Sequence, residues 1–149
     1  MTTRAMLVSI LYRMAGEPDV SELPETPFED VGPDAWYADA VRWAYANEVA
    51  AGMDDTHFAP DDRLTRAQLV TMLYRAYGPE KGVRPRPIGG YTDWNTVPEW
   101  AYPAATWAVS MGLLYGTSSS QLSPNAGANR AQLAAFMMRT CELQSELDA

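Results

Sequence analysis

The chain has little of several residue types that define whole classes of protein. Its 149 residues include one cysteine and one histidine, which excludes an internal disulfide framework and cysteine-based zinc sites. No apolar run is long enough to cross a bilayer, and no uninterrupted apolar stretch typical of a signal peptide opens the chain. Eleven basic residues face 19 acidic ones, for a net charge of −8. We therefore expect neither nucleic acid nor an anionic membrane as a partner, and no membrane insertion.

Signs of catalytic or metal chemistry are equally scarce. The single histidine, His57, has no second ligand at a metal-binding spacing and is expected to lie in an exposed loop. The aspartates between positions 54 and 62 do not follow the calcium-loop spacing. Because no residues indicate a nucleophile or a general base, we expect no catalytic residues, no metal ligands and no cofactor.

What the chain does have is an internal repeat. A short polar residue, an arginine and an alanine precede an apolar run at helical spacing three times. The arginines lie 62 and 64 residues apart. A near-constant period of this size indicates one supersecondary unit used repeatedly. The three copies are Thr3-Arg4-Ala5, Thr65-Arg66-Ala67 and Asn129-Arg130-Ala131.

The middle copy belongs to a unit with the pattern helix, loop, helix. Asp34 is the expected N-cap of the first helix, and Gly52 stands where a left-handed residue would end it. A polar loop follows, and Thr65 begins a second helix that Gly78 and Pro79 stop. The expected buried face of the first helix comprises Trp36, Ala40, Trp43 and Ala44.

Two and a half such units predict five helices and an all-α fold. Because one unit cannot bury its apolar stripe alone, the units must pack on one another, with the three arginine-bearing helices at the centre. We expect a single domain over residues 1–149. It divides into a half repeat at 1–18, full repeats at 28–79 and 91–142, an extended linker at 17–27 and a second linker at 79–90.

The arginine at the start of the second helix is the unusual feature of the repeat. The helix dipole disfavours a cation at this position by about 0.3–1 kcal/mol. Unpaired helical N–H groups beside a guanidinium would instead form an anion site. The alternative is that each arginine pairs with an acidic loop residue, such as Asp54 or Asp61, and clamps the loop.

Structural roles explain other positions of the repeat. The patterns Thr65-x-x-Gln68 and Asn129-x-x-Gln132 are typical of capping boxes. Arginines recur nine residues after each of the first set, at positions 13, 75 and 139. Near a helix C-terminus a cation is favourable, so we expect them to be structural. The tail from Glu142 is expected to prolong the last helix.

The tryptophans divide into two pairs. Trp43 and Trp107 lie in the middle of an apolar stripe and are expected in the core. Trp36 and Trp100 lie in a first helical turn, where an indole can be partly exposed and can stack on a sugar. Core packing is the favoured interpretation of both pairs.

The repeat resembles the S-layer homology (SLH) repeat over nearly the whole chain. The resemblance is carried by Phe28-x-Asp30-Val31, by Trp36-Tyr37-x-x-Ala40-Val41-x-Trp43-Ala44, by Phe58-x-Pro60 and by Leu64-Thr65-Arg66-Ala67-Gln68. It implies a pseudo-threefold prism around a three-helix bundle. It also implies inter-repeat grooves that bind secondary cell wall polysaccharide, often with a pyruvylated sugar, at Gram-positive-type cell surfaces.

The resemblance also implies roles for individual residues. Arg4, Arg66 and Arg130 match the arginine that contacts the anionic sugar, and the Arg66 groove keeps most family features. Gly52 and Gly116 match the glycine that lets backbone approach the ligand. The candidate ligand-binding set is completed by Trp36, Trp100 and Asp54.

Departures from the family pattern limit the resemblance. The motif's glutamate is replaced by Met6, Gln68 and Gln132, and serines at 118–120 replace the acidic loop of the middle repeat. The first repeat lacks its front half, so either one groove is lost or a second copy of the chain supplies the missing helix.

We therefore expect a non-catalytic cell-wall anchoring module that binds an anionic wall polysaccharide. The alternative is an SLH-like module for protein–protein interaction or self-assembly without glycan binding, as a homo-oligomer. An enzyme is the least favoured interpretation.

Overall fold

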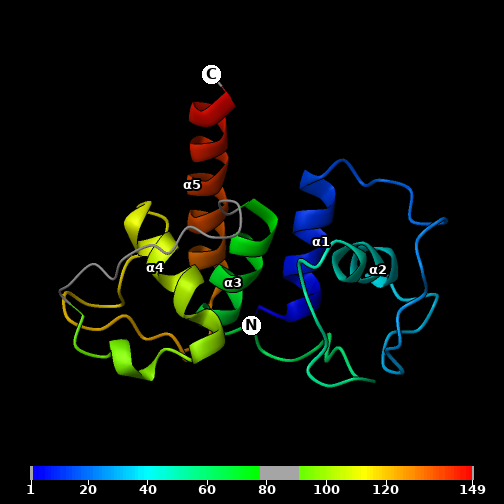
Figure 1. The fold of residues 1–149 in the computed structure, drawn as a ribbon, viewed down its shortest axis with the longest axis horizontal. Helices are drawn as coiled ribbons and strands as arrows, with labels where there is room; N and C mark the ends of the chain where they lie inside the picture. Colours follow the sequence, from blue (N-terminus) through cyan, green and yellow to red (C-terminus); the bar gives the residue numbers. More distant parts are fainter. Residues whose placement is uncertain (1, 78–90, 149) are drawn as a thin grey trace. The chain divides into compact units, whose positions relative to one another are not determined.

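The computed structural model describes residues 2–77 and 91–148, with side chains up to Glu142 at the C-terminal end. Figure 1 shows the helices along the chain. Within these ranges there is no strand, only two isolated β-bridges. The all-α prediction is therefore confirmed. The elements are α1 (Arg4–Met14), α2 (Ala38–Ala46), α3 (Arg66–Tyr77), η1 (Trp94–Thr96), η2 (Glu99–Ala101), α4 (Tyr102–Ser110) and α5 (Arg130–Asp148).

The chain forms two compact units that meet in sequence between Leu64 and Thr65. This boundary lies inside the middle sequence repeat. Each unit therefore combines the second helix of one repeat with the first helix and loop of the next. The single domain and its threefold arrangement stay predictions.

Each unit has its own hydrophobic core. In residues 2–64, α1 packs against α2, and in the following unit α3 packs against α4. Burying these apolar side chains is the main source of stability. Fully or almost fully buried side chains in the first unit include Leu7, Leu11, Val41 and Phe58, and in the second unit Leu69, Leu73, Leu113 and Leu122.

The second helix of each repeat starts where the sequence predicts. Thr65 and Gln68 exchange hydrogen bonds across the start of α3, at 3.0 and 3.1 Å. Asn129 and Gln132 do the same at α5, at 3.1 and 2.8 Å. Both capping boxes are confirmed. Helix α5 also continues through the acidic tail, as expected.

The first helix of the middle repeat is shorter than expected. Two successive turns, closed by hydrogen bonds from Ala35 to Gly32 and from Ala38 to Ala35, precede α2. The N-cap position is therefore Tyr37, which makes no side-chain capping bond, and the prediction of Asp34 as N-cap is wrong. Each turn is closed by a bond between residues three positions apart, so the chain turns twice before the α-helical hydrogen bonds begin.

The C-terminal end of α2 also differs from the prediction. The helix ends at Ala46, and Glu48 takes the left-handed conformation with φ +58°. Gly112 takes the same role after α4 with φ +71°. Gly52 therefore does not end a helix. After α1, Gly16 is left-handed with φ +89°.

The linkers are described only in part. The 17–27 linker contains a turn closed by a hydrogen bond from Leu23 to the Val20 carbonyl oxygen, so the prediction that it is extended is wrong. Val20 is 7% exposed, and burying its side chain favours this turn. The expected stop at Gly78 and Pro79 and the 79–90 linker lie outside the described residues.

Candidate functional site

The arginine at the start of α3 is buried against the loop of the next repeat. Its side chain is 3% exposed. The Nε atom donates to the Leu122 carbonyl oxygen at 3.2 Å, and Nη2 donates to the Tyr115 carbonyl oxygen at 2.5 Å. Arg66 therefore fastens a loop that lies 49 to 56 residues further along the chain.

Arg4 repeats this arrangement in the other unit. Its Nε donates to the Phe58 carbonyl oxygen at 2.9 Å and its Nη2 to the Ala51 carbonyl oxygen at 2.7 Å. The guanidinium also lies 4.7 Å from the centre of the Phe58 ring, a cation–π distance. Arg4 is 4% exposed. The same donors thus meet loop carbonyls at equivalent positions in both units.

The first helical N–H groups are used by the same loops. At α3, Arg66 and Ala67 donate to the carbonyl oxygens of Ala126 and Pro124, at 2.9 and 2.8 Å. At α1, Arg4 and Ala5 donate to Asp62 and Pro60, at 3.2 and 3.0 Å. The prediction of open amide donors beside these two arginines is therefore wrong. Loop carbonyls satisfy the donors that a helix start leaves unpaired.

The alternative of a carboxylate partner does not hold for Arg66 either. Among the described residues, no carboxylate lies within ion-pair distance of its guanidinium. Burial lowers the pKa of Arg66, and the more distant charges of Tyr91 and Asp93 partly offset this effect. An arginine remains protonated under these conditions. Arg66 holds its loop through backbone carbonyl oxygens and not through the carboxylate that the alternative required.

Asp54 is occupied within its own loop. Its Oδ1 accepts hydrogen bonds from the backbone N–H groups of Thr56 and His57, at 2.9 and 2.8 Å. These bonds shape the tip of the loop. His57 is exposed there, as expected.

A second aspartate in each unit braces the loop that holds the arginine. The Asp93 carboxylate accepts hydrogen bonds from the N–H groups of Leu122 and Ser123, at 2.8 and 2.9 Å. Burial raises the pKa of Asp93, but these backbone hydrogen bonds more than offset it, so the net pKa is lowered. Asp30 has the same bonds to Phe58 and Ala59 and the same direction of shift.

The two predicted glycines allow close packing inside these loops. A Cβ at Gly116 would lie 2.5 Å from Tyr91 Cε1 and 2.6 Å from the Ser118 carbonyl oxygen. A Cβ at Gly52 would lie 2.5 Å from the Asp54 carbonyl oxygen. Neither glycine has a positive φ, so lack of space is the reason for a glycine at both positions.

Residues 65–148 contain a pocket between the buried arginine, its loop and the start of α5. Its volume is about 310 Å³. The lining has two arginines and no acidic residue, although the whole chain carries a net charge of −8. Such a concentration of positive charge favours an anionic guest. The lining residues are Arg66, Tyr115, Gly116, Asn129, Ala131, Gln132, Ala135, Phe136 and Arg139.

Arg139 is the functional candidate that sequence reasoning missed. Arg13 and Arg75 lie in the last turns of their helices, as expected. Because α5 runs on to Asp148, Arg139 lies in the helix interior instead. Its guanidinium lies 4.4 Å from the centre of the Tyr115 ring. The tail from Glu142, which is free of glycine and proline and extends α5, is the signal that could have revealed this position.

The pocket brings together two of the predicted site residues, Arg66 and Gly116. Arg130 is exposed at the start of α5 and does not line it. Trp100 belongs to the same unit but also lies outside the lining. The other predicted site residues belong to the unit of residues 2–64 and are Arg4, Gly52, Trp36 and Asp54.

The tryptophans differ from the favoured interpretation. Trp36 is 67% exposed and Trp100 is 54% exposed, so the expectation that they pack in the core is wrong. Both lie ahead of their α-helix, in a turn or a 3₁₀ segment, so neither belongs to the buried stripe of the helix itself. Trp107 is buried as expected, whereas Trp43 is half-buried against Tyr12.

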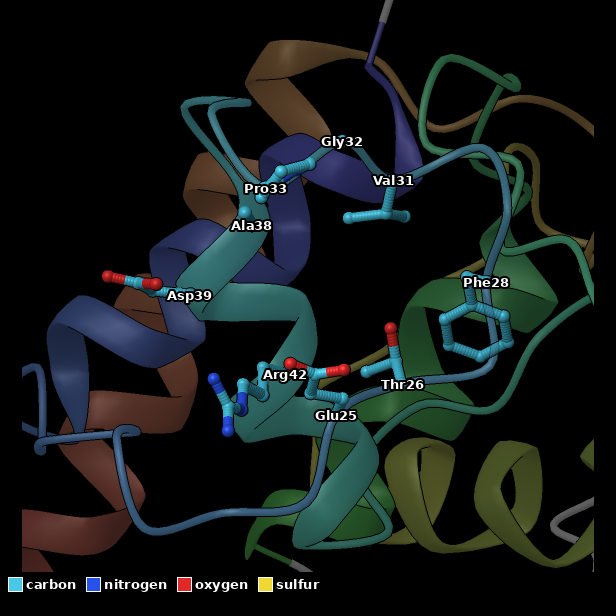
Figure 2. A pocket seen from close by; sticks show the side chains of 9 residues that line it. All are labelled: Glu25, Thr26, Phe28, Val31, Gly32, Pro33, Ala38, Asp39 and Arg42. Atoms are coloured by element: carbon cyan, nitrogen blue, oxygen red, sulfur yellow. The ribbon is translucent and has the colours of Figure 1, made fainter.

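A second pocket, of about 350 Å³, lies in the unit of residues 2–64 (Figure 2). Glu25, Asp39 and Arg42 contribute its charged groups. Figure 2 labels Arg42 and Glu25 together with the Phe28 ring among the residues that line it. The Arg42 guanidinium donates to the carbonyl oxygens of Leu23 and Pro24. This pocket has two carboxylates, and its one arginine already donates to backbone carbonyl oxygens. It is therefore a poorer site for an anion than the pocket at Arg66.

Two further findings concern other kinds of site. Among the described residues, no group of three or more His, Cys, Asp or Glu side chains has a metal-binding arrangement. Over the same ranges, no helix combines the length and apolar character needed to span a membrane.

Comparison with known proteins identifies both full repeats. Residues 27–70 and 90–134 match the S-layer homology domain. The chain is 34% identical over 119 residues to the surface-layer 125 kDa protein of Lysinibacillus sphaericus. It is 31% identical over 144 residues to an endoglucanase of Bacillus sp. (strain KSM-635), and 24% identical over 150 residues to the cellulosome-anchoring protein of Acetivibrio thermocellus.

These matches cover most of this chain but little of the relatives. They include 77%, 95% and 94% of the chain, respectively. They include only 10% of the surface-layer protein, 15% of the endoglucanase and 32% of the cellulosome-anchoring protein. The similarity to the endoglucanase is therefore confined to a small part of that enzyme.

Proposed function

Because this chain belongs to the S-layer homology family, whose members are cell-surface anchoring modules, we propose that it binds an anionic polysaccharide of the cell wall. Its place is the cell surface, like that of its surface-layer relatives. We propose that the module is non-catalytic and that any enzymatic activity belongs to other parts of the proteins that carry it.

The observation that carries the proposal is the charge of the pocket at Arg66. Two guanidinium groups and no carboxylate line it. A guanidinium offers planar, paired donors that match a carboxylate or phosphate oxygen pair. A negatively charged substituent on a wall sugar, such as a pyruvyl group, is therefore the guest that this lining favours.

The remaining lining suits the sugar itself. The Tyr115 ring, 56% exposed, gives an apolar face on which a sugar ring can stack. The side-chain amides of Asn129 and Gln132 give hydrogen-bonding groups at the start of α5. A pocket of about 310 Å³ is within the range of small-ligand sites.

The roles within this pocket follow from burial. The Nε and Nη2 atoms of Arg66 already donate hydrogen bonds to loop carbonyl oxygens. Its contribution is therefore to fix the loop and to supply positive charge. Arg139 is half-buried, and among the residues whose side chains the structure describes its hydrogen bond is a weak one, to the Leu113 carbonyl oxygen at 3.4 Å. We assign direct contact with the anion to Arg139. The ligand roles of Arg4, Arg130, Gly52, Trp36, Trp100 and Asp54 stay predictions.

The test is sedimentation of the chain with purified, pyruvylated wall polysaccharide. Arg139→Gln is expected to weaken binding at least about tenfold, because a charged hydrogen bond contributes roughly 1.5–3 kcal/mol. Arg75→Gln is the matched control, since Arg75 has the equivalent position on α3 and is exposed. Equal loss in both variants, or no loss in either, would contradict the proposal.

Exposed aromatic and sulfur-containing side chains favour a second candidate, protein–protein association without glycan. Trp36, Trp100 and Met138 are each more than half exposed. Such side chains are enriched at protein interfaces. Light scattering of the chain distinguishes the candidates, because self-assembly predicts a mass that rises with concentration and does not depend on the polysaccharide.

A further inference from the structure

The pocket in the unit of residues 2–64 has an apolar interior. Phe28, Val31 and Ala38 are among its lining residues, which Figure 2 labels, and its volume is about 350 Å³. Phe28 is 6% exposed, and its ring packs edge to face against Tyr45 with ring centres 5.2 Å apart. A ring that is buried and packed in this way gives the pocket a fixed wall.

The next repeat has aromatic rings where this pocket has small side chains. Val31 follows the aspartate that braces its loop, and the residue after the equivalent aspartate of the next repeat is Trp94. Ala38 corresponds to Tyr102, which lies 64 positions later. The Trp94 and Tyr102 rings pack on each other, with centres 5.8 Å apart. The pocket therefore occupies the place of an aromatic pair.

The charged groups of the pocket are also particular to this repeat. Asp39 and Arg42 correspond to Pro103 and Thr106, each 64 positions later. Arg42 donates to two carbonyl oxygens of the 17–27 linker, and among the described residues it forms no ion pair with Glu25 or Asp39. Both carboxylates are exposed and are charged at neutral pH. The mouth of the pocket therefore favours a cation.

We infer that this pocket is a binding site for an aromatic ring that carries a positive charge, such as an indole with an ammonium group. The ring takes the place equivalent to the aromatic pair of the next repeat and packs on Phe28. The cation lies at Glu25 and Asp39. Because Arg42 holds the linker and Phe28 is fixed in the core, the pocket is formed before the ligand arrives, which reduces the cost of binding.

This chemistry has two sources. One is a free aromatic amine, and the other is an aromatic side chain beside a basic residue of another polypeptide. A second copy of this chain is a poor source of the indole. Its exposed tryptophans, Trp36 and Trp100, lie within two positions of Asp34 and Glu99, whose carboxylates repel those of the pocket.

The site is independent of the pocket proposed for the polysaccharide. The two pockets share no lining residue and belong to different units of the chain. Their charges also differ, because the polysaccharide pocket has no acidic residue. Variants of one pocket therefore leave the lining of the other unchanged.

The experiment is an NMR titration of the isotope-labelled full chain with two indoles of opposite charge. Tryptamine carries an ammonium group, and indolepropionate carries a carboxylate. We expect tryptamine to shift the amide signals of Val31, Ala38 and Asp39 and to bind at least about fivefold more tightly than indolepropionate. The dipeptide acetyl-Trp-Lys-amide distinguishes the sources. Tighter binding than tryptamine indicates another polypeptide, and weaker binding indicates a free amine.

A variant that fills the pocket tests where the ring lies. Val31→Trp with Ala38→Tyr places the aromatic pair of the next repeat in this one. We expect it to weaken tryptamine binding at least about tenfold, because the space for the ring is then occupied. The dispersion of its amide signals shows whether the variant is folded.

A second pair of variants tests the charge and does not depend on how the first one folds. Glu25→Gln with Asp39→Asn should reduce the preference for tryptamine over indolepropionate to about twofold or less. The matched control is Glu22→Gln with Asp34→Asn, which removes two exposed carboxylates of the same unit outside the lining. This control should keep most of the preference.

Four results would overturn the inference. The first is an absence of shifts at the lining amides with every probe, and the second is equal affinity for the two indoles. The third is undiminished tryptamine binding by the folded, filled variant. The fourth is a shift of the same amides when the chain alone is concentrated, which would make a second copy the occupant.

Discussion

The Asp93 carboxylate accepts a hydrogen bond of 2.9 Å from the backbone N–H of Ser123, a residue with φ +56°. A left-handed conformation is unfavourable for a residue with a side chain. The carboxylate stabilises it and at the same time holds the adjacent Leu122, whose carbonyl oxygen accepts from Arg66. One aspartate thus supports the loop on which the buried arginine depends.

Replacing this aspartate is expected to loosen the loop. Asp93→Asn leaves one acceptor oxygen for two N–H groups and removes the charge, at a cost of about 1–2 kcal/mol in the free energy of unfolding. Urea denaturation measures the change. Asp34→Asn is the control, because Asp34 is exposed and caps no helix. Equal stabilities of the two variants would argue against the bracing role.

The lowered pKa values of Asp30 and Asp93 predict a dependence of stability on pH. Their folded pKa values lie below the ordinary aspartate value of about 3.9. Their stabilising contribution is therefore complete above that value and is lost as pH falls through it towards the folded pKa. Urea midpoints between about pH 7 and pH 2.5 should fall at the acidic end. The fall should be smaller in the Asp30→Asn, Asp93→Asn double variant; an identical slope would contradict this.

Adding a methyl group at Gly116 is expected to displace the loop. The new Cβ would collide with the Tyr91 ring and the Ser118 carbonyl oxygen. Gly116→Ala should therefore destabilise the unit by about 1–3 kcal/mol and weaken polysaccharide binding at the pocket that Gly116 lines. Gly32→Ala is a suitable comparison, since nothing lies within 4 Å of a Cβ there. Wild-type behaviour of both variants would count against this account of Gly116.

Substitutions at the left-handed residues that follow α2 and α4 are expected to change the free energy of unfolding in opposite directions. Glu48 and Gly112 occupy equivalent left-handed positions. Glu48→Gly should raise the free energy of unfolding by about 0.5–1 kcal/mol, because glycine adopts this conformation without steric cost. Gly112→Ala should lower it by a similar or larger amount. Thermal unfolding would show the two shifts, and Glu48→Ala should stay near the wild-type value.

A lysine at position 66 is not expected to hold the loop as the buried arginine does. A single ammonium group does not reproduce the planar donors that reach both Leu122 and Tyr115. Arg66→Lys should cost about 2 kcal/mol in the free energy of unfolding, whereas Arg13→Lys on the exposed end of α1 should cost little. Chemical denaturation of both variants decides, and a neutral Arg66→Lys would contradict the clamping role.

The parts of the fold that the sequence predicted are those set by local patterns. The starts of α3 and α5 follow from capping boxes and apolar spacing, which act within a few residues. The start and end of α2 were missed because two short hydrogen-bonded turns precede it and a left-handed Glu48, not a glycine, follows it. The apolar spacing does not distinguish such turns from a first helical turn, and Glu48 is not a residue type that predicts a left-handed conformation.

The candidate site was predicted in part for the same reason. Charge and spacing identified Arg66 as unusual, and the Gly116 position followed from the repeat. The acceptors of Arg66 lie 49 and 56 residues away in the next repeat, so no local pattern connects them. Arg139 was taken as a helix-end cation by analogy with Arg13 and Arg75, although the expected continuation of α5 through the tail places it in the helix interior.

Because the boundary between the two units lies between Leu64 and Thr65, inside a repeat, duplication of one repeat in the gene would not add one complete structural unit. A newly added repeat would not stand beside its predecessor as a finished module. It would close the preceding arginine-bearing helix and leave its own last helix waiting for a successor. An array of such repeats would therefore grow by completing one unit at a time, and the second helix of its last repeat would be the part left to pair with a newly added segment.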